Sequence, residues 1–203
     1  MKQCMAIMIG ALGLAVAAPA NLVQNPGFES GVELTWTAQN ETTNWFGWGD
    51  VESVGSGWKT PHSGSQSLVL KNWMGAGDGV EQKSDVTAMT TYDLSFYSLW
   101  DGGYDGSMAA QVRWIDAGGS QIGSNMFAWT KGAADAWTLT AVQVTSIVNT
   151  ARAEINLDNS GGTSGALYID DVAFDAAAVP EPATAGLVSL VGLALLALRR
   201  KQS

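Results

Sequence analysis

The sequence predicts an all-β domain built as an antiparallel β-sandwich. Three observations lead to this prediction. Several short segments alternate apolar and polar residues with a period of two, glycine-rich turns separate these segments at nearly regular spacing, and no window inside the domain shows a convincing amphipathic helix. Short strands joined by such turns are typical of a sandwich, in which the first and last strands are often neighbours.

The N-terminus predicts export. Lys2 precedes an apolar run, residues 5–17, and residues 18–20 have the small-x-small pattern of a signal-peptide cleavage site. We therefore expect residues 1–20 to be a signal peptide and Asn21 to be the first residue of the exported protein. Cleavage two or three residues earlier fits the same pattern.

One domain, residues 21–176, lies between the two ends of the chain and is long enough to bury a sizeable core. It holds six lysine and arginine residues against eighteen aspartate and glutamate residues, so its net charge is 6 − 18 = −12. This charge argues against nucleic acid or an anionic polymer as a partner. The only cysteine, Cys4, precedes the domain, so the exported protein would have neither disulfides nor thiolate metal sites.

The expected strands follow one another along the chain. A short strand near Leu22 ends at the turn of residues 25–27, and Trp36 belongs to the next strand, before a loop-rich region at residues 40–57. Further strands are expected at residues 66–72, 92–100, 108–114, 125–130, 137–145, 152–157 and 166–174.

Two groups of side chains are candidates for contact with a sugar. Trp45 and Trp48 lie in the loop-rich region, where they would be exposed, although most of the nine tryptophans are expected in the core. If segments 92–100 and 108–114 pair as a hairpin, Tyr97, Gln111 and Arg113 share one solvent-facing surface, with an aromatic ring beside hydrogen-bond donors. Alternatively, the Arg113 stem only covers apolar surface.

The sequence contains no recognisable catalytic group. His62, the only histidine, lies in the turn of residues 61–65 without a second histidine, a cysteine or an evident carboxylate partner, so we interpret it as a turn residue. No strand carries the Glu-x-Asp-x-x-Glu pattern that some jelly-roll glycosidases use. We therefore expect a protein that is not an enzyme.

Carboxylates stand at both sequence ends of the domain. Glu29 follows the first turn, and Asp170 and Asp171 lie in the last expected strand. If the first and last strands are neighbours, these groups would repel each other unless a cation joined them. Calcium is suited to this because it binds several hard oxygen atoms. The alternative is that all three face water on an exposed strand edge.

The C-terminus, residues 177–203, ends in a hydrophobic segment. Residues 183–198 are apolar except for Thr184 and Ser189, and three basic residues follow. As a helix the segment would be about 24 Å long, which is short of a hydrocarbon core of about 30 Å. We expect a marginal transmembrane helix with the basic residues on the cytoplasmic side.

This tail closely resembles the PEP-CTERM sorting signal. The motif Pro180, Glu181, Pro182 is followed by a single apolar span and then by Arg199, Arg200 and Lys201. The resemblance implies cleavage near the motif by a membrane transpeptidase of the exosortase type, which releases or re-attaches the protein at the cell surface or in the extracellular matrix. An ordinary C-terminal membrane anchor is the alternative.

The domain itself resembles carbohydrate-binding modules of families 4, 9 and 22. The motifs that carry the resemblance are, in order, residues 25–31 (NPGFESG), 62–68 (HSGSQSL), 91–96 (TYDLSF) and 168–172 (YIDDV). The resemblance implies a galactose-binding-like jelly roll with a structural calcium ion held by Glu29 and Asp171. Asp170 is the less favoured choice, because adjacent strand residues point to opposite faces.

These observations together predict an exported, non-catalytic carbohydrate-binding domain whose partner is a neutral polysaccharide. The competing hypothesis is a structural surface or matrix protein that keeps the jelly roll but has no sugar site. Exposed aromatic side chains on the binding sheet would favour the first hypothesis, and an all-polar sheet would favour the second.

Overall fold

The computed structural model describes residues 20–32, 44–71, 77–127 and 131–178. Within these ranges the chain forms β1 (Phe46–Trp48), β2 (Val51–Gly55), β3 (Gln66–Lys71), β4 (Asp78–Asp85), β5 (Thr91–Trp100), β6 (Ser107–Ile115), β7 (Gln121–Phe127), β8 (Thr138–Thr145), β9 (Arg152–Ser160) and β10 (Ala166–Ala176). The predicted signal peptide up to residue 19, Trp36, the segment 183–198 and the motif Pro180, Glu181, Pro182 lie outside the described residues, so what was predicted for them stays a prediction. Among the described residues, no helix has the length and apolarity that crossing a membrane requires.

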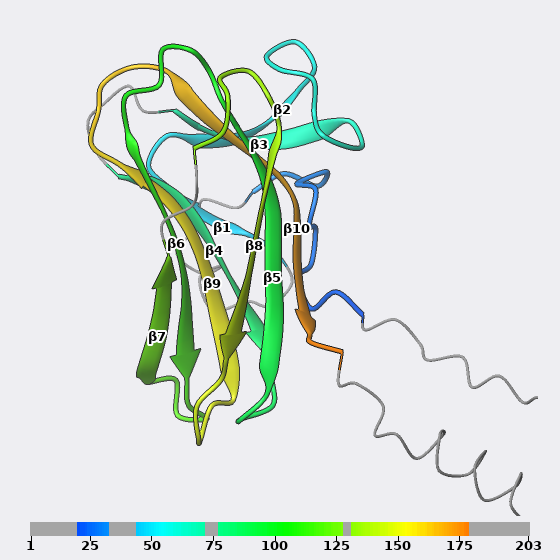
Figure 1. The fold of residues 1–203 in the computed structure, drawn as a ribbon, viewed down its shortest axis with the longest axis vertical. Helices are drawn as coiled ribbons and strands as arrows, with labels where there is room; N and C mark the ends of the chain where they lie inside the picture. Colours follow the sequence, from blue (N-terminus) through cyan, green and yellow to red (C-terminus); the bar gives the residue numbers. More distant parts are fainter. Residues whose placement is uncertain (1–19, 33–43, 72–76, 128–130, 179–203) are drawn as a thin grey trace, which may run out of the picture.

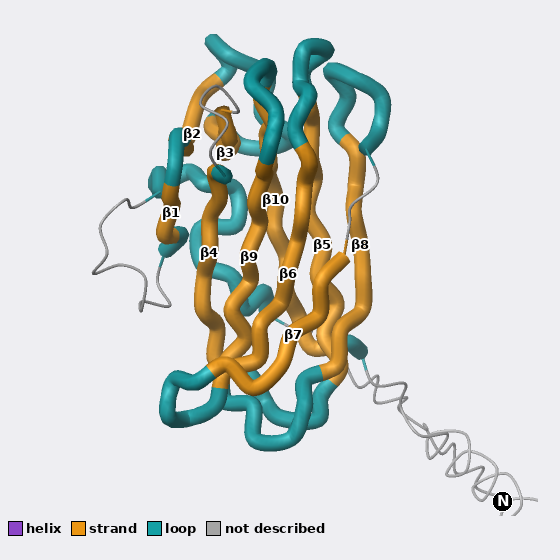
Figure 2. The backbone as a smooth tube through the Cα atoms, turned by 90° about the vertical axis from the view of Figure 1, so that its left-hand side faces the viewer, coloured by secondary structure: helices purple, strands orange, loops and turns teal. Residues whose placement is uncertain are grey.

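The strands form two antiparallel five-stranded sheets that pack face to face (Figures 1 and 2). One sheet has the order β1-β4-β9-β6-β7 and is called here the β9 sheet, after its central strand. The other has the order β2-β3-β10-β5-β8 and is called the β10 sheet. The predicted all-β antiparallel sandwich is thus confirmed for the described part of the chain.

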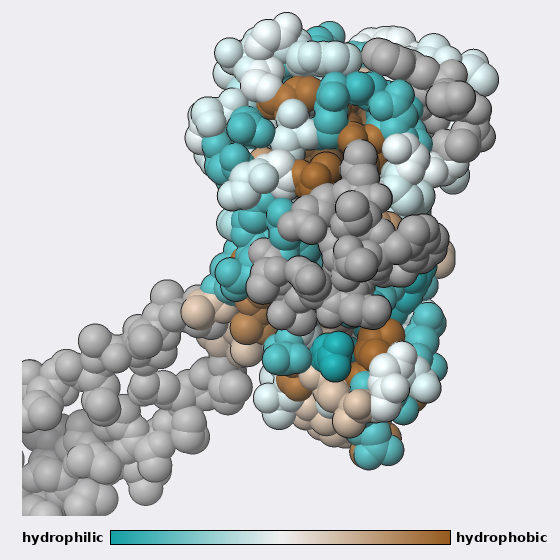
Figure 3. All heavy atoms as spheres, turned by 180° about the vertical axis from the view of Figure 1, so that it is seen from behind, coloured by the Kyte–Doolittle hydropathy of each residue, from teal (hydrophilic) through white to brown (hydrophobic). Residues whose placement is uncertain are grey.

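The core lies between the two sheets. Each central strand contributes alternate apolar side chains to it, and Trp114, Phe96 and Phe174 are among the largest that are fully buried. The surface seen from behind the view of Figure 1 mixes hydrophilic residues with small groups of hydrophobic ones (Figure 3). Such scattered apolar groups are normal for a soluble domain surface.

The first described residues lie along the last strand, as the sequence predicted. The Leu22 amide donates to the Phe174 carbonyl at 2.9 Å, and the Asn21 side chain bonds both to the carbonyl of Val172 and to the amide of Phe174. The described segment 20–32 contains no strand, in contrast to the expected short strand near Leu22. It reaches across to the other sheet instead, where Gln82 of β4 bonds to the backbone of Gln24.

The strands with clear alternation were predicted correctly. Strands β3, β5, β6, β8, β9 and β10 lie within a few residues of their expected positions, and β7 begins four residues before its expected start. The region of residues 40–57, which was expected to be loop-rich, contains the short strands β1 and β2, and β4 was not predicted at all. β1 and β2 are only three and five residues long, and β4 has few apolar residues.

A second apolar cluster covers the outer face of the β10 sheet. Val69, Leu99 and Tyr168 pack there with partly buried Trp137, outside the main core. As a consequence β3, which reads as half-buried in the sequence, is buried on both faces from Ser67 to Lys71. The outer faces of the two sheets therefore differ: part of the β10 sheet carries a buried apolar cluster, whereas the middle of the β9 sheet is polar.

Candidate functional site

The outer face of the β9 sheet carries a continuous set of polar side chains. On β9, apolar residues that face the core alternate with Glu154, Asn156 and Asp158, which face outward. Because β9 is the central strand, these three side chains occupy the middle of the sheet. The strand register places Glu81 of β4 and Gln111 of β6 on either side of Asn156.

Ion pairs fix the side chains around Glu154. Its carboxylate lies 2.6 Å from Nη1 of Arg113 and 3.4 Å from Nζ of Lys83, so one carboxylate bridges two cations from neighbouring strands. Nε of Arg113 donates to Oε1 of Gln111 at 2.9 Å, and its Nη1 lies 3.8 Å from Glu81. Gln111 and Arg113 therefore share one face and contact each other, as the sequence predicted for this pair.

Asn156 and Asp158 keep hydrogen-bonding capacity next to this network. Asn156 is 2% exposed, and its Oδ1 has no hydrogen-bond partner among the described residues. Asp158 is half-buried; burial raises the pKa of its carboxyl group, and the nearby charge of Arg113 opposes that shift. The centre of the face thus holds a buried amide oxygen without a partner and, beside it, a partly exposed carboxylate.

Trp48 supplies an aromatic ring at the edge of the same face. The register pairs it with Gly79 of β4, which in turn faces Asp158 of β9. A Cβ atom at Gly79 would overlap the six-membered ring of Trp48, so glycine is needed for the indole to lie across the sheet. The structure therefore places Trp48, Gln111 and Arg113 on one surface, with the indole near Asp158.

Trp45 is not an exposed platform, and that prediction was wrong. The side chain is fully buried, its ring lies tilted against Phe28 at 5.2 Å between ring centroids, and its indole N–H donates to the carbonyl of Asn25. The partners come from about twenty residues earlier in the chain. Burial of an indole with its N–H satisfied is a core role.

Tyr97 does not lie with Gln111 and Arg113, and this prediction was also wrong. Strands β5 and β6 belong to different sheets, so Tyr97 faces outward on the opposite side of the sandwich. One face of its ring is covered by His62, whose ring is stacked on it at 3.5 Å. Tyr97 therefore helps to hold the loop of His62 in place.

Sequence reasoning missed five polar residues of the face: Glu81, Lys83, Glu154, Asn156 and Asp158. A signal was present for three of them, because residues 152–160 read Arg-Ala-Glu-Ile-Asn-Leu-Asp-Asn-Ser, with an unbroken row of polar side chains alternating with apolar ones. Glu81 and Lys83 had no such signal, since β4 also has polar residues on its core side.

The three carboxylates from the two ends of the domain meet at the loop of residues 61–66. Glu29 accepts hydrogen bonds from the amides of Ser65 and Gln66 and from the Ser65 hydroxyl, and the Ser65 bonds are the main cause that lowers its pKa. Asp170 accepts the amides of His62 and Ser63. The loop is thus tied to both ends of the sandwich.

Asp170 and Asp171 approach the same place although they are adjacent. A β-bulge interrupts β10 between Asp170 and Ala173, and Asp171 has a left-handed backbone conformation with φ of 49°. A Cβ atom at Gly27 would lie 3.4 Å from Oδ1 of Asp170 and 3.8 Å from Oδ1 of Asp171. The expectation that alternation separates these two side chains therefore fails at the bulge.

This group can be compared with what a calcium ion needs. Asp170 is fully buried, and burial raises the pKa of its carboxyl group to about 6. A Cβ atom at Gly27 would be in ordinary contact with one oxygen of each aspartate and, at 3.8 Å, with Cγ of Glu29, whose carboxylate is turned toward Ser65. However, no three acidic, histidine or cysteine side chains of the described residues stand close enough to form a ready-made metal site. The donor set fits calcium in kind, and binding would require small side-chain movements.

His62 has a partner that the sequence did not reveal. Its Nδ1 lies 2.6 Å from Oδ2 of Asp171, while the Ser63 hydroxyl donates to Oδ1 of the same carboxylate at 2.6 Å. The aspartate therefore lies between the histidine and the serine. In a catalytic triad the histidine lies between the other two, so this arrangement does not activate the serine.

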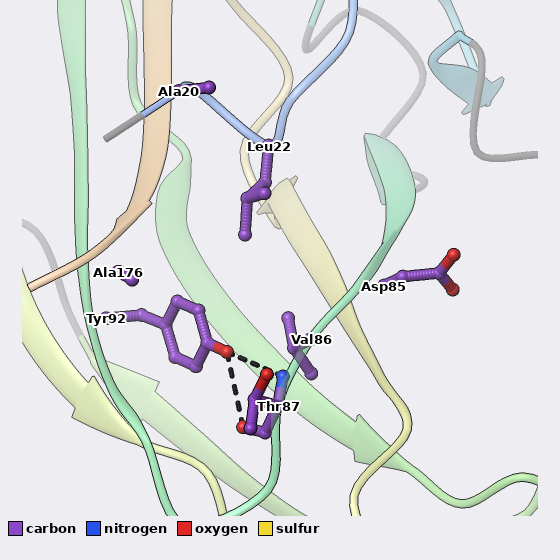
Figure 4. A pocket seen from close by; sticks show the side chains of 7 residues that line it. All are labelled: Ala20, Leu22, Asp85, Val86, Thr87, Tyr92 and Ala176. Atoms are coloured by element: carbon purple, nitrogen blue, oxygen red, sulfur yellow. Dashed lines mark hydrogen bonds between the residues drawn. The ribbon is translucent and has the colours of Figure 1, made fainter. Parts of the chain in front are cut away.

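A mostly apolar pocket of about 420 Å³ lies at the end of the sandwich where both described chain ends are found (Figure 4). It is lined by Leu22, Val86 and Tyr92, together with neighbouring residues. The Tyr92 hydroxyl accepts the Thr87 amide at 2.7 Å and donates to the Thr87 carbonyl. The Tyr92 hydroxyl and the Thr87 backbone are thus already paired with each other. The pocket is separate from the polar face of the β9 sheet.

Comparison with known proteins identifies the fold. No family model and no curated protein matches the sequence. Among solved structures, the enzymatically active domain of tailspike protein 4 of bacteriophage CBA120 matches 77% of this chain, with a TM-score of 0.57 and 20% identity. This chain spans only 21% of that solved domain.

Carbohydrate-binding modules match over their whole length. A family 61 module solved with β-1,4-galactotriose has 20% identity and a TM-score of 0.52, with 77% of this chain and 99% of the module covered. The CBM22-1 xylan-binding domain of Xyn10C from Paenibacillus barcinonensis has 18% identity and a TM-score of 0.55, with 82% and 100% covered. Modules of families 4 and 16 share the fold as well. The described part of the chain therefore has the two-sheet jelly-roll fold of carbohydrate-binding modules, which confirms at the level of the fold the resemblance to families 4 and 22.

Proposed function

We propose that the domain is a non-catalytic module that binds a neutral polysaccharide on the outer face of the β9 sheet. The observation that carries this proposal is the unpartnered, buried Oδ1 of Asn156 at the centre of a sheet face, beside Asp158 and within reach of the Trp48 ring. Sugars combine hydroxyl groups with an apolar ring face. An amide, a carboxylate and an indole complement both.

The charges of this face favour a neutral ligand. Lys83 and Arg113 stand against Glu81, Glu154 and Asp158, so two cations face three carboxylates. Both cations are already engaged by Glu154. A uronate would add a negative charge to a face whose three carboxylates are not fully balanced by its two cations. We therefore expect uronic acid polymers to bind more weakly than neutral chains.

The first ligands to test are neutral galactans and xylans, because one protein with this fold was solved with β-1,4-galactotriose and another is a xylan-binding domain. Affinity electrophoresis and calorimetry would compare the purified protein with an Asn156→Ala variant. The proposal predicts retardation by at least one neutral polysaccharide and a loss of about tenfold or more in affinity for the variant, since a buried hydrogen bond to the ligand disappears. No binding by the folded protein to a broad panel of glycans would exclude it.

We also propose that Glu29, Asp170 and Asp171 hold a structural calcium ion. The support is the convergence of their side chains around Gly27 and the burial of Asp170, whose charge a cation would compensate. When bound, calcium would join the first turn, the loop of residues 61–66 and the bulge of β10. It would have no part in contacting the polysaccharide, which lies on the other sheet.

The ends of the chain support a proposal about location: the protein is exported and sorted to the cell surface or extracellular matrix by an exosortase-type transpeptidase. The support is the pattern of residues 1–20 and the motif Pro180, Glu181, Pro182 before the apolar span. Mass spectrometry of the native protein tests this. A mature N-terminus at or near Asn21 and a chain that ends near the motif are expected, whereas an intact C-terminus would favour an ordinary anchor.

A structural role without sugar binding is the second candidate. One observation favours it: Glu154, Lys83 and Arg113 satisfy one another, so part of the face needs no ligand. We propose no catalytic activity in either case, and support for this comes from the order of Ser63, Asp171 and His62, which does not suit nucleophile activation. Release of reducing ends from any bound polysaccharide would contradict that.

A further inference from the structure

A second polar cluster lies inside the sandwich, on the core side of the β9 sheet and therefore behind its polar face. Asp78, the first residue of β4, is 3% exposed and is paired in register with Asn159 of β9, which is fully buried. Tyr104, from the loop between β5 and β6, is 4% exposed and belongs to the main core. Three polar side chains from three segments of the chain thus lie in the interior near one end of the sandwich.

Two of these side chains have unsatisfied polar atoms. Neither Oδ1 nor Nδ2 of Asn159 has a hydrogen-bond partner among the described residues, and the same holds for the hydroxyl of Tyr104. Buried polar atoms without partners are costly, and in folded proteins they are rare unless water or an ion completes them. The side-chain amide of Asn159 lacks both an acceptor for its N–H and a partner for its oxygen. A bound water or ion would therefore have to accept from the N–H and also contact the oxygen.

The electrostatics of the cluster favour a cation. Asp78 accepts one hydrogen bond, from the Asp50 amide at 2.8 Å, but none of the described lysine and arginine side chains forms an ion pair with it. Burial raises the pKa of Asp78, and the charge of Asp50 raises it further. Burial also raises the pKa of Tyr104, and the carboxylates of Asp105, Asp158 and Asp78 add to this. The hydroxyl therefore lies near three carboxylates, and one cation, Nζ of Lys131, lies 5.2 Å from the centre of the Tyr104 ring.

We infer that Asp78, Asn159 and Tyr104 form an internal site for a calcium ion. The carboxylate of Asp78 and Oδ1 of Asn159 bind the ion, the Tyr104 hydroxyl contacts it directly or through water, and a water on the ion accepts the Asn159 N–H. Calcium takes six to eight oxygen ligands and readily keeps waters among them. This site is separate from the proposed calcium at Glu29, and it does not depend on the proposed glycan binding.

The position of the site has a consequence for the outer face of the β9 sheet. Asp78 directly precedes Gly79 on β4, and Asn159 directly follows Asp158 on β9. Gly79 and Asp158 are paired in register, and the Trp48 ring lies against Gly79. An ion between β4 and β9 would hold these two strands together directly behind that ring. The internal site would thus support the edge of the polar face without touching a ligand.

Calcium binding to four forms of the full protein tests the inference: wild type, Glu29→Gln, Asp78→Asn and the double variant. Asparagine at position 78 keeps an oxygen for the Asp50 amide, so folding is preserved. Equilibrium dialysis should show one ion fewer in Asp78→Asn than in wild type, and one fewer in the double variant than in Glu29→Gln. Equal stoichiometry in each of these pairs would overturn the inference, whatever Glu29→Gln itself does.

A second variant asks whether the guest is a cation or only water. Asn159→Asp adds a carboxylate to a calcium site, so affinity should rise by about tenfold or more, because calcium affinity depends on ligand charge. Asn125→Asp adds the same charge on exposed β7 and should leave calcium affinity unchanged. If Asn159→Asp instead melts at a lower temperature and calcium does not restore it, the cluster holds water and the inference is wrong. Retention of sodium in place of calcium would equally overturn it.

Discussion

Trp48 has surroundings that suit a ligand-contacting side chain rather than a core residue. It is only partly buried, its ring lies across Gly79 at the edge of the polar face, and Phe46 supports it at 6.5 Å. Trp45, three residues earlier, is fully buried. A shift of three positions thus separates a core tryptophan from a surface one, because β1 begins between them.

Replacement of Trp48 is the sharpest test of the polar face at the residue level. Trp48→Ala should weaken binding to a neutral polysaccharide by roughly tenfold, since a stacked ring contributes about 0.5–1.5 kcal/mol beyond the area that it buries. Calorimetry measures this, and Trp48→Phe should recover part of the affinity.

Trp58 provides the matched control for this experiment. It is 45% exposed and follows β2, in the other sheet. Trp58→Ala should bind as the wild type does, and equal losses in both variants would mean that the ligand is not held by the face that carries Trp48.

At the scale of the strands, connections between elements matter more than their individual patterns. Strands β5 and β6 alternate so clearly that each was predicted, yet the loop of residues 101–106 carries the chain from one sheet to the other, so they do not pair. Local periodicity says which side chains share a face of one strand but not which strand is its neighbour. For this reason Tyr97 was assigned to the wrong surface.

The strands that the sequence did not reveal have a common physical cause. On β4 the core-side positions include Gln82 and Ser84, which are buried because they bond to the backbone of Gln24 and Leu22. Hydrophobic alternation is therefore absent from a strand that is nevertheless buried. The convergence of Glu29 with Asp170 and Asp171 was predictable from the closeness of the first and last segments, but the bulge that brings both aspartates together was not.

Removal of calcium should loosen the loop of residues 61–66. Chelation is expected to lower the melting temperature by about 5–15 °C, the range that follows from losing a ligand present at roughly a thousand times its dissociation constant in a domain of this size. Glu29→Gln should melt lower in calcium and respond less to chelator. A melting temperature that is the same with and without chelator would contradict the proposed ion.

The turn between β9 and β10 should show a pH dependence through Asp105. Its carboxylate accepts the amides of Ser164 and Thr163, and these bonds lower its pKa. A lowered folded-state pKa means that the bonds stabilise the fold above the unfolded pKa and that this is lost as the pH falls through the folded value. Asp105→Asn should therefore have a lower melting temperature than wild type at pH 7, and the gap should narrow as the pH falls below the unfolded value of about 3.9.

The outer faces of the two sheets differ, and the first described residues are hydrogen-bonded to the last strand. The β10 sheet is covered by the cluster around Tyr168, the β9 sheet presents its polar row, and residues 20–24 fill the space beside the lower half of β10 (Figure 1). The N-terminal segment is therefore part of the sandwich although it forms no strand.

Deletion of residues 21–24 should destabilise the entire domain. Val23 is 3% exposed in the main core, and burying one such side chain contributes about 1.5–3 kcal/mol. The hydrogen bonds of Asn21 to β10 would be lost in addition. Urea unfolding should show a drop of about 2–4 kcal/mol in the free energy of unfolding, and an unchanged midpoint would mean that the segment only lies on the surface.

The two described ends leave the sandwich together, where Leu22 bonds to Phe174 and Ala177 bonds to Thr91. A domain tethered through this end would have its strands roughly perpendicular to the supporting surface. Its polar face would then be perpendicular to that surface as well. Across the strands, the polar face extends from Trp48 on β1 to Gln111 on β6, so a polysaccharide bound in this direction would lie parallel to the supporting surface. Many such domains on one surface would therefore hold polysaccharide chains parallel to that surface and at a common distance from it.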